Sequence, residues 1–263
     1  MELTGILTRV ISGAVLAAVV VYVAKRTRTL STSGALAAWV AGTLCVAAGW
    51  AWGALLLAMF VSASGLSGIG EKRKAERLRG VIDVRRERDA AQVIANGGLH
   101  AVAAAGFMIF PSPVWYAMGA GALAAAASDT WATEVGTLFG GEPISITSGG
   151  RVAAGTSGGI TAVGTAAAVG GALFIAAATL LANWPVPFAA VSLGGMAGAL
   201  ADSLLGGTIQ ERRWCELCAC STERRVHDCG TPTQHVGGVT RFENDAVNML
   251  CSGVGAVVAL FLS

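Results

Sequence analysis

The sequence predicts an all-α fold: a polytopic bundle of about seven or eight transmembrane helices with a Cys/His loop on the cytoplasmic side. Of its 263 residues, 54% are hydrophobic and only 13% are charged, about half the roughly 25% that soluble domains carry. The mean hydropathy is +0.64. Thirty-six glycines and long alanine runs suit helices whose backbones approach closely inside a bilayer.

Eight apolar runs each approach the ~20 residues that a helix needs to span the hydrocarbon of a bilayer. The runs cover 5–24, 33–49, 51–69, 92–110, 113–136, 156–182, 186–209 and 244–262. The short run at 33–49 decides between seven spans and eight. Tight turns at 49–53 and 110–115 join two pairs of runs into hairpins. We therefore interpret 1–263 as one transmembrane domain.

The distribution of basic residues predicts the orientation of the bundle. If all eight runs cross, the loops alternate sides, and every Lys and Arg except Arg9 falls on one side. The positive-inside rule makes that side cytoplasmic and places both termini outside. Residues 208–243 then form a cytoplasmic loop. The cations at 72–74 are expected to be solvated or attracted to anionic headgroups.

Two aspartates interrupt the apolar runs at their cytoplasmic ends: Asp129 in "ALAAAASDTWATEVGTLFGG" and Asp202 in "GGMAGALADSLLGGTIQ". A charge at mid-membrane costs ~2.5–3.5 kcal/mol on insertion scales, so such residues usually face the interior of a bundle. Each follows small residues and precedes a hydroxyl residue, Thr130 in the first case. A faint internal repeat and a chance result of composition both explain this likeness. Structural hydrogen bonds between helices are the alternative to a functional role.

Converging carboxylates repel one another unless a cation neutralises them. Mg²⁺ prefers one or two carboxylates together with substrate phosphate oxygens. We therefore predict that Asp129, Glu134 and Asp202 hold Mg²⁺. Asp129 and Glu134 lie about 140° apart on a regular helix, so Glu134 shares the ion only if the helix unwinds near its glycine-rich end. Acidic residues inside the membrane, at the cytoplasmic mouth of the bundle, indicate phosphate chemistry or ion transport.

The segment "PISITSGGRVAAGTSGGITAVG" (143–164) carries Arg151 alone in a Gly/Ser/Thr-rich loop. The "GTSGG" that follows is expected to open an apolar helix. Helix N-terminal N–H groups bind anions, and glycines let the backbone approach a phosphate. We predict phosphate contacts from Arg151, Gly155, Thr156 and Ser157. A helix start with small-residue packing explains "GTSGG" equally well.

A polar stripe enters the run at 92–110. Its members share one helical face, because they are spaced 4, 3, 4 and 4 residues apart: Arg85, Asp89, Gln92, Asn96 and His100. Asn96 is predicted to line the substrate site. His100 either hydrogen-bonds between helices or has a catalytic role.

The last run begins with "RFENDAVNML" (241–250). Asn244 and Asn248 are four residues apart on one face, with Asp245 alongside, and their oxygens suit a cation or a polar headgroup. An N-cap at Asn244 with Asp245 in the first turn is the alternative. That alternative does not account for Asn248.

The loop "WCELCACSTERRVHDCGTPTQH" (214–235) contains four of the six cysteines. Disulfides rarely persist in the cytoplasm, so metal binding is the better explanation. Zinc takes four nitrogen or sulfur ligands, and a Cys-x2-Cys knuckle supplies two. The preferred ligands are Cys215, Cys218, His227 and Cys229, with Cys220 and His235 as substitutes. A full ligand set leaves no open position, so the zinc would be structural. A reduced, metal-free loop is the alternative.

These motifs follow one another as in a known integral-membrane family. They are "NGG" (96–98), "SDTWATEVG" (128–136), "ITSGGRVAAGTSGGITAVG" (146–164), "ADSLLGGTIQ" (201–210), the Cys/His loop and "NDAVN" (244–248). From about residue 31 onward the sequence resembles the family that includes plant phytyl phosphate kinase and many uncharacterised bacterial and archaeal members. A weaker likeness extends to dolichol kinase and phytol kinase, which usually carry Lys where this sequence has Arg151.

The resemblance implies a kinase that transfers a phosphoryl group from a nucleoside triphosphate, CTP in characterised relatives, to a polyprenyl monophosphate such as phytyl or geranylgeranyl phosphate. The implied catalytic residues are Asp129, Arg151 and Asp202; Thr130 would bind substrate or nucleotide with the asparagines. The expected partners are CTP, the isoprenoid phosphate and membrane lipids, without nucleic acid, and a homo-oligomer is left open. The expected location is a bacterial cytoplasmic membrane, with the active site facing the cytoplasm.

Two other functions fit the same residues. A cytidylyltransferase acting on a lipid phosphate would use the same substrates and release pyrophosphate instead of CDP. A lipid or ion transporter also uses paired carboxylates and Gly-rich interrupted helices. Clustering of the polar residues at one mouth, instead of along a path across the bilayer, disfavours transport.

Overall fold

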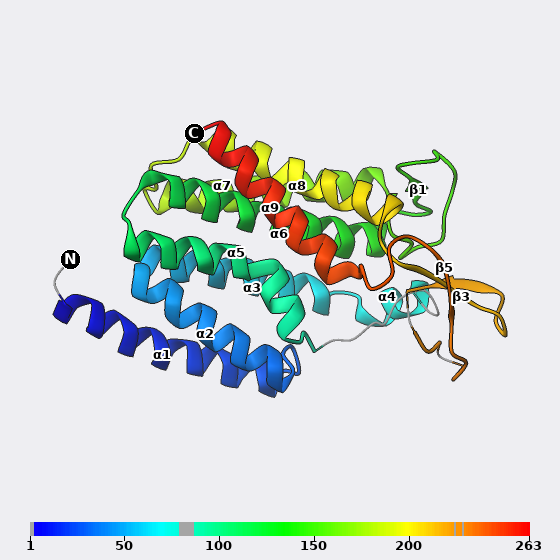
Figure 1. Ribbon diagram of the computed structural model, residues 1–263, viewed down its shortest axis with the longest axis horizontal. Helices are drawn as coiled ribbons and strands as arrows, with labels where there is room; N and C mark the ends of the chain where they lie inside the picture. Colours follow the sequence, from blue (N-terminus) through cyan, green and yellow to red (C-terminus); the bar gives the residue numbers. More distant parts are fainter. Residues whose placement is uncertain (1–2, 79–86, 224, 228) are drawn as a thin grey trace.

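The computed structural model, which describes residues 3–78, 87–223, 225–227 and 229–263, is a helix bundle (Figure 1). Within those residues, eight long helices pack side by side and one short helix, α4 (Glu71–Arg77), lies at one end. The long helices are α1 (Leu3–Arg26), α2 (Thr32–Ala48), α3 (Trp50–Gly68), α5 (Ala90–Ile109), α6 (Pro113–Phe139), α7 (Ala162–Leu181), α8 (Phe188–Thr208) and α9 (Asn244–Phe261). The predicted helical bundle is confirmed.

Successive long helices run in opposite directions, so both termini lie at one end of the bundle (Figure 1). The opposite end, which we call the loop end, carries α4 and the segments 140–161 and 209–243. Gly49 alone separates α2 from α3, and Ser112 caps α6 by accepting a hydrogen bond from the Val114 N–H. Both predicted hairpins are thereby confirmed.

Six helices in the described part of the chain are long and apolar enough to cross a membrane: α1, α3, α5, α7, α8 and α9. Helix α2 has 17 residues and is shorter than a full span. Helix α6 has 27 residues and lies at the centre, against α5, α7, α8 and α9, with every residue from 119 to 128 buried. The fold is that of a polytopic membrane protein built around α6.

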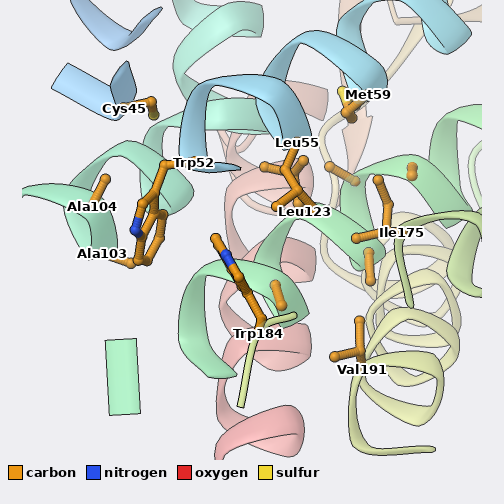
Figure 2. Close-up of a cluster of buried hydrophobic side chains, with 14 of the residues drawn as sticks. Cys45, Trp52, Leu55, Met59, Ala103, Ala104, Leu123, Ile175, Trp184 and Val191 are labelled. Carbon is orange, nitrogen blue, oxygen red and sulfur yellow. The ribbon is translucent and has the colours of Figure 1, made fainter. Parts of the chain in front are cut away.

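The core has one region packed by large aromatic and aliphatic side chains and another packed by small residues. Near the terminal end, Trp52 and Trp184 pack with ring centroids 4.5 Å apart, and Leu123 and Ile175 lie close by in the same cluster (Figure 2). Around α6 the contacts are between small residues. A Cβ on Gly121 would lie 2.3 Å from the carbonyl oxygen of Gly255, so this crossing requires glycine.

The loops of the loop end contain short antiparallel strands, which the sequence did not predict. Strands β1 (Ile144–Ser145) and β2 (Gly159–Ile160) form one pair. Strands β3 (Arg212–Cys215), β4 (Cys220–Thr222) and β5 (Gln234–Gly237) form a sheet in the order β4-β3-β5. Both sheets lie in loops that connect successive helices, β1 and β2 between α6 and α7 and β3 to β5 between α8 and α9. They therefore add to the predicted bundle without changing its fold class.

The expectation that "GTSGG" opens a helix is wrong. Helix α7 begins at Ala162, and its N-cap is Thr161, whose side chain accepts from the Gly164 N–H. Gly155 and Gly158 have φ angles of 84° and 77°, which form tight turns and exclude a continuous right-handed helix. The segment therefore forms a loop that leads into β2.

Candidate functional site

The centre of the site is a contact between two carboxyl groups. Asp129 on α6 and Asp202 on α8 lie within hydrogen-bonding contact of each other. The two helices cross closely one turn earlier, where a Cβ on Gly198 would lie 2.3 Å from the Cβ of Ala125. Because Ala125 and Gly198 each precede an aspartate by four residues, this crossing places both carboxyl groups on the facing sides of α6 and α8. The structure thus brings together the two aspartates that the sequence singles out.

One oxygen of this carboxyl pair, Oδ1 of Asp202, is buried without a hydrogen-bond partner in the described part of the chain. Leaving a buried acceptor unpaired costs about 1–3 kcal/mol. Two adjoining carboxylates also repel one another unless a proton or a cation lies between them. This donor set therefore fits a hard divalent cation, which satisfies the oxygen and neutralises the charge.

A third carboxylate reaches the same centre from the Cys/His loop. Glu223 follows β4, and its Oε1 accepts hydrogen bonds from Ser157 Oγ and from Gln210 Nε2, the latter at 3.0 Å. It lies close enough to Asp202 to repel it electrostatically. Burial raises the pKa of Glu223 above its usual range, although both hydrogen bonds oppose the shift. Glu223 was not predicted as a site residue, because it stands in a charged stretch typical of solvated loops.

The Gly-rich loop lies against α8 beside the aspartates. A Cβ on Gly158 would lie 2.5 Å from Cα of Gly207 and 2.9 Å from the carbonyl oxygen of Ser203, the residue after Asp202. Ser157 therefore lies at the same mouth as the aspartate pair, and Gly155 and Thr156 belong to the same turn. Successive N–H groups in such turns bind anions without a helix N-terminus.

Arg151 lies in an exposed part of the loop, where its Nη1 donates to Glu142 Oε2 at 2.9 Å. Both residues line a groove of about 330 Å³, together with Arg77 of α4. Arg77 also donates to the carbonyl oxygens of Leu138 and Gly141 at the end of α6. The groove therefore presents two guanidinium groups beside the C-terminus of the helix that carries Asp129.

Glu134 does not join the aspartates, which corrects the predicted ligand set. Helix α6 is unbroken through Phe139, so Glu134 stays on another face and accepts hydrogen bonds from Ser67 Oγ and, at 2.5 Å, from Lys74 Nζ. Lys74 is buried, and it donates to the carbonyl oxygens of Leu66 and Ser67 at 2.8 Å each. The expectation that Lys74 is solvated is therefore wrong.

The polar stripe of α5 divides into separate roles. Asp89 is the N-cap and accepts from the Gln92 N–H at 3.1 Å, and Asn96 donates to the Gln92 carbonyl of its own helix. His100 is buried, with Nδ1 3.0 Å from the Gly119 carbonyl oxygen and Nε2 3.1 Å from that of Trp52. Of its two predicted roles, the interhelical hydrogen bond fits the structure. Arg85 lies outside the described residues.

Helix α9 also faces the centre. Its N-cap is Glu243, not Asn244, which is the exposed first residue of the helix. Asn248 is buried and lies one turn before Cys251, a side chain close enough to both aspartates to interact with them electrostatically. Residues three apart share a helical face, so Asn248 points toward the aspartate side of α9. Asn244 lies one turn earlier on the same face and is exposed.

The Cys/His loop gathers a separate set of metal-ligand side chains, as the spacing predicts. The ligand atoms of Cys215, Cys218, His227 and Cys229 all lie within 4.8 Å of one another. His227 turns Nδ1 toward Cys229 Sγ at 3.3 Å and Nε2 toward Cys220 Sγ at 3.5 Å. Hydrogen bonding with Thr231 and His227 lowers the pKa of the Cys229 thiol to about 6. His235 instead contacts the Gly238 carbonyl oxygen at 3.2 Å. Three sulfurs and one nitrogen fit tetrahedral zinc.

The fold and the site define an integral membrane protein with an acidic centre between its helices and a separate Cys3His cluster in a loop. The chain belongs to the integral membrane protein family DUF92, which it matches over residues 15–256. It is similar to Protein PGR of Arabidopsis thaliana, with 27% identity over 275 residues that cover 92% of each chain. No solved structure matches it.

Proposed function

We propose that the protein is a CTP-dependent kinase that converts a membrane polyprenyl monophosphate, of the phytyl or geranylgeranyl type, into the diphosphate. The observation that carries this proposal is the Asp129–Asp202 contact with its unpartnered buried oxygen. Ser157 donates to Glu223, which lies within electrostatic reach of Asp202. Asn248 is buried one turn before Cys251, which interacts electrostatically with both aspartates. Membership of a family with the sequence motifs of phytyl phosphate kinase supports it.

Phosphoryl transfer needs positioning and charge neutralisation more than covalent chemistry. Asp129 and Asp202 would hold Mg²⁺, which neutralises the charge on the transferring phosphoryl group. The Gly155–Ser157 turn would donate N–H and hydroxyl groups to phosphate oxygens. The accepting phosphate monoester is largely a dianion near neutral pH, because its second pKa is about 6. No strong general base is required.

The position of the centre suits a lipid substrate. Asp129 and Asp202 lie in the loop-end halves of α6 and α8, about 15 Å and 9 Å of helix from the ends of these helices. A polar head that enters from the loop end can reach them while its apolar tail stays among the helices. Arg151 and Arg77 line the groove beside the end of α6, where they would attract the donor triphosphate. We place the loop end in the cytoplasm, because the described lysines and arginines other than Arg9 lie there. The expected bacterial membrane stays part of this proposal, although a protein similar to this chain occurs in a plant.

A structural zinc ion in the Cys3His cluster completes the proposal. The four ligand atoms are close enough for one ion, and all four positions would be filled by protein. The ion would fasten the sheet of β3, β4 and β5, which carries Glu223 toward the aspartates.

A direct test is turnover of the purified protein with CTP, Mg²⁺ and geranylgeranyl phosphate, for the wild type and for Asp129→Asn. We expect CDP and the diphosphate from the wild type and a loss of at least about 100-fold in the variant. Undiminished turnover by the variant would rule out its metal role. Pyrophosphate as the product would identify a cytidylyltransferase, and nucleotide-independent flux in liposomes would favour a transporter.

A further inference from the structure

Three segments that are far apart in sequence meet at the carboxylate of Glu223. Ser157 comes from the Gly-rich loop, Gln210 follows the end of α8, and Glu223 itself comes from the Cys/His loop. Asp202 lies within electrostatic reach, on the same helix that ends just before Gln210. Glu223 is thus the residue that brings the Cys/His loop within electrostatic reach of the acidic centre.

The hydrogen bonds of Glu223 fix its orientation. Both donors use Oε1, which leaves Oε2 as the oxygen that can take up a further ligand. Nearby, Oδ1 of Asp202 is buried and unpartnered within the described residues. Two carboxylates within electrostatic reach of each other repel unless a proton or a cation neutralises them. Oε2 of Glu223 and Oδ1 of Asp202 are therefore the two oxygens that could coordinate one cation.

We propose that Glu223 is a third carboxylate ligand of the divalent cation held by Asp129 and Asp202, so that the Cys/His loop completes the cation site from outside the bundle. The proposal rests on the cation assigned to the aspartates in the proposed function, but not on the kinase reaction. Carboxylate oxygens suit Mg²⁺ and Mn²⁺, and an octahedral ion held by three of them keeps water or phosphate in its remaining positions.

An experiment can distinguish a metal-ligand role for Glu223 from a purely structural role. The isosteric Glu223→Gln keeps a carbonyl oxygen that can accept from Ser157 and Gln210, and it removes the charge that a cation requires. Glu216 provides the matched control. It belongs to the same loop and also accepts from a glutamine amide, Gln234 Nε2 at 2.8 Å, but it is exposed.

The test measures Mn²⁺ binding by electron paramagnetic resonance in the full-length protein purified in detergent. We expect Glu223→Gln to weaken Mn²⁺ binding about 10- to 100-fold, as loss of a group supporting a metal site typically does. Asp202→Asn should weaken it at least as much, and Glu216→Gln should bind like the wild type. Glu223→Asp, which retains the charge, should recover part of the affinity. Zinc content and melting temperature without Mn²⁺ should stay unchanged in Glu223→Gln.

Wild-type Mn²⁺ affinity in Glu223→Gln, with Asp202→Asn impaired, would overturn the assignment of Glu223. Equal weakening by Glu216→Gln would overturn it too, because the effect would then come from loop charge in general. A wild-type protein that binds Mn²⁺ through Glu223 but turns over no CTP would support this inference and contradict the proposed kinase reaction.

Discussion

Asp129 and Asp202 meet one helical turn beyond the point at which Ala125 of α6 touches Gly198 of α8. The contact between the two carboxyl groups therefore depends on how closely the backbones of α6 and α8 approach. Van der Waals packing of small residues is a main source of helix association in a bilayer. The same packing places two like charges together at the loop end, so the stability of the bundle and the geometry of the site are set by one crossing.

Gly198→Ala should damage both properties. The added Cβ would lie 2.3 Å from the Cβ of Ala125, and relieving that clash should cost about 1–3 kcal/mol of unfolding free energy. We expect a lower melting temperature in detergent and weaker Mn²⁺ binding. Gly253→Ala in α9 is the control, because its Cβ would lie 3.9 Å from the nearest atom, on Leu99. Equal melting temperatures for the two variants would contradict the close crossing.

The sequence was sufficient to predict the helices and the aspartate pair, because both depend on local features. Apolar runs of bilayer length fold as helices wherever they pack. Asp129 and Asp202 stand out because each interrupts a run of small apolar residues. The Cys215–Cys229 set was predictable for another reason: ligand spacing within one short loop restricts which side chains can meet.

Residues whose roles depend on distant partners could not be predicted. Lys74 belongs to a charged run, and only the folding of α4 against α6 shows that it is buried beside Glu134. Glu223 likewise lies among charged neighbours, and its partners Ser157 and Gln210 come from other segments. A one-dimensional pattern cannot distinguish a charge that meets such partners from one that faces water.

Lys74→Met should destabilise the loop end strongly. The substitution leaves Glu134 without its buried ammonium partner, and removing one member of a buried pair typically costs 3–5 kcal/mol. We expect about 3 kcal/mol, at the lower end of that range, because Arg88 also lies near Glu134. Thermal unfolding in detergent measures the loss. Adding Glu134→Gln should restore part of the stability, and a double variant less stable than Lys74→Met would show that the two side chains are not coupled.

Zinc content should identify the ligands of the Cys/His loop. Cys218→Ser should lose the bound zinc, because it removes one of the four convergent ligand atoms, whereas Cys220→Ser should retain it. Mass spectrometry of the purified variants gives the zinc per chain. Zinc loss from Cys220→Ser with retention in Cys218→Ser would reverse the assignment. Chelation of wild-type zinc should make 209–243 sensitive to protease and leave the helices intact.

Glu211 should make the stability of the loop depend on pH. Burial favours its neutral form, but hydrogen bonds from the Arg241 N–H at 2.8 Å and from Arg213 at 2.5 Å, with the charge of Arg225, outweigh burial and lower its pKa. A carboxyl whose pKa is lowered by folding stabilises the native state above its usual value of about 4.3, and this contribution disappears as the pH falls through the lowered native pKa.

The difference in protease resistance between the wild type and Glu211→Gln isolates this contribution, because acid-induced loss of zinc affects both proteins alike. We expect the wild-type loop to be the more resistant at pH 7 and the advantage to shrink as the pH falls below about 4.3. An advantage that grows on acidification would mean that folding raises the Glu211 pKa. The three arginine contacts would then fail to compensate for burial, and the loop would need another anchor to hold Glu223 near Asp202.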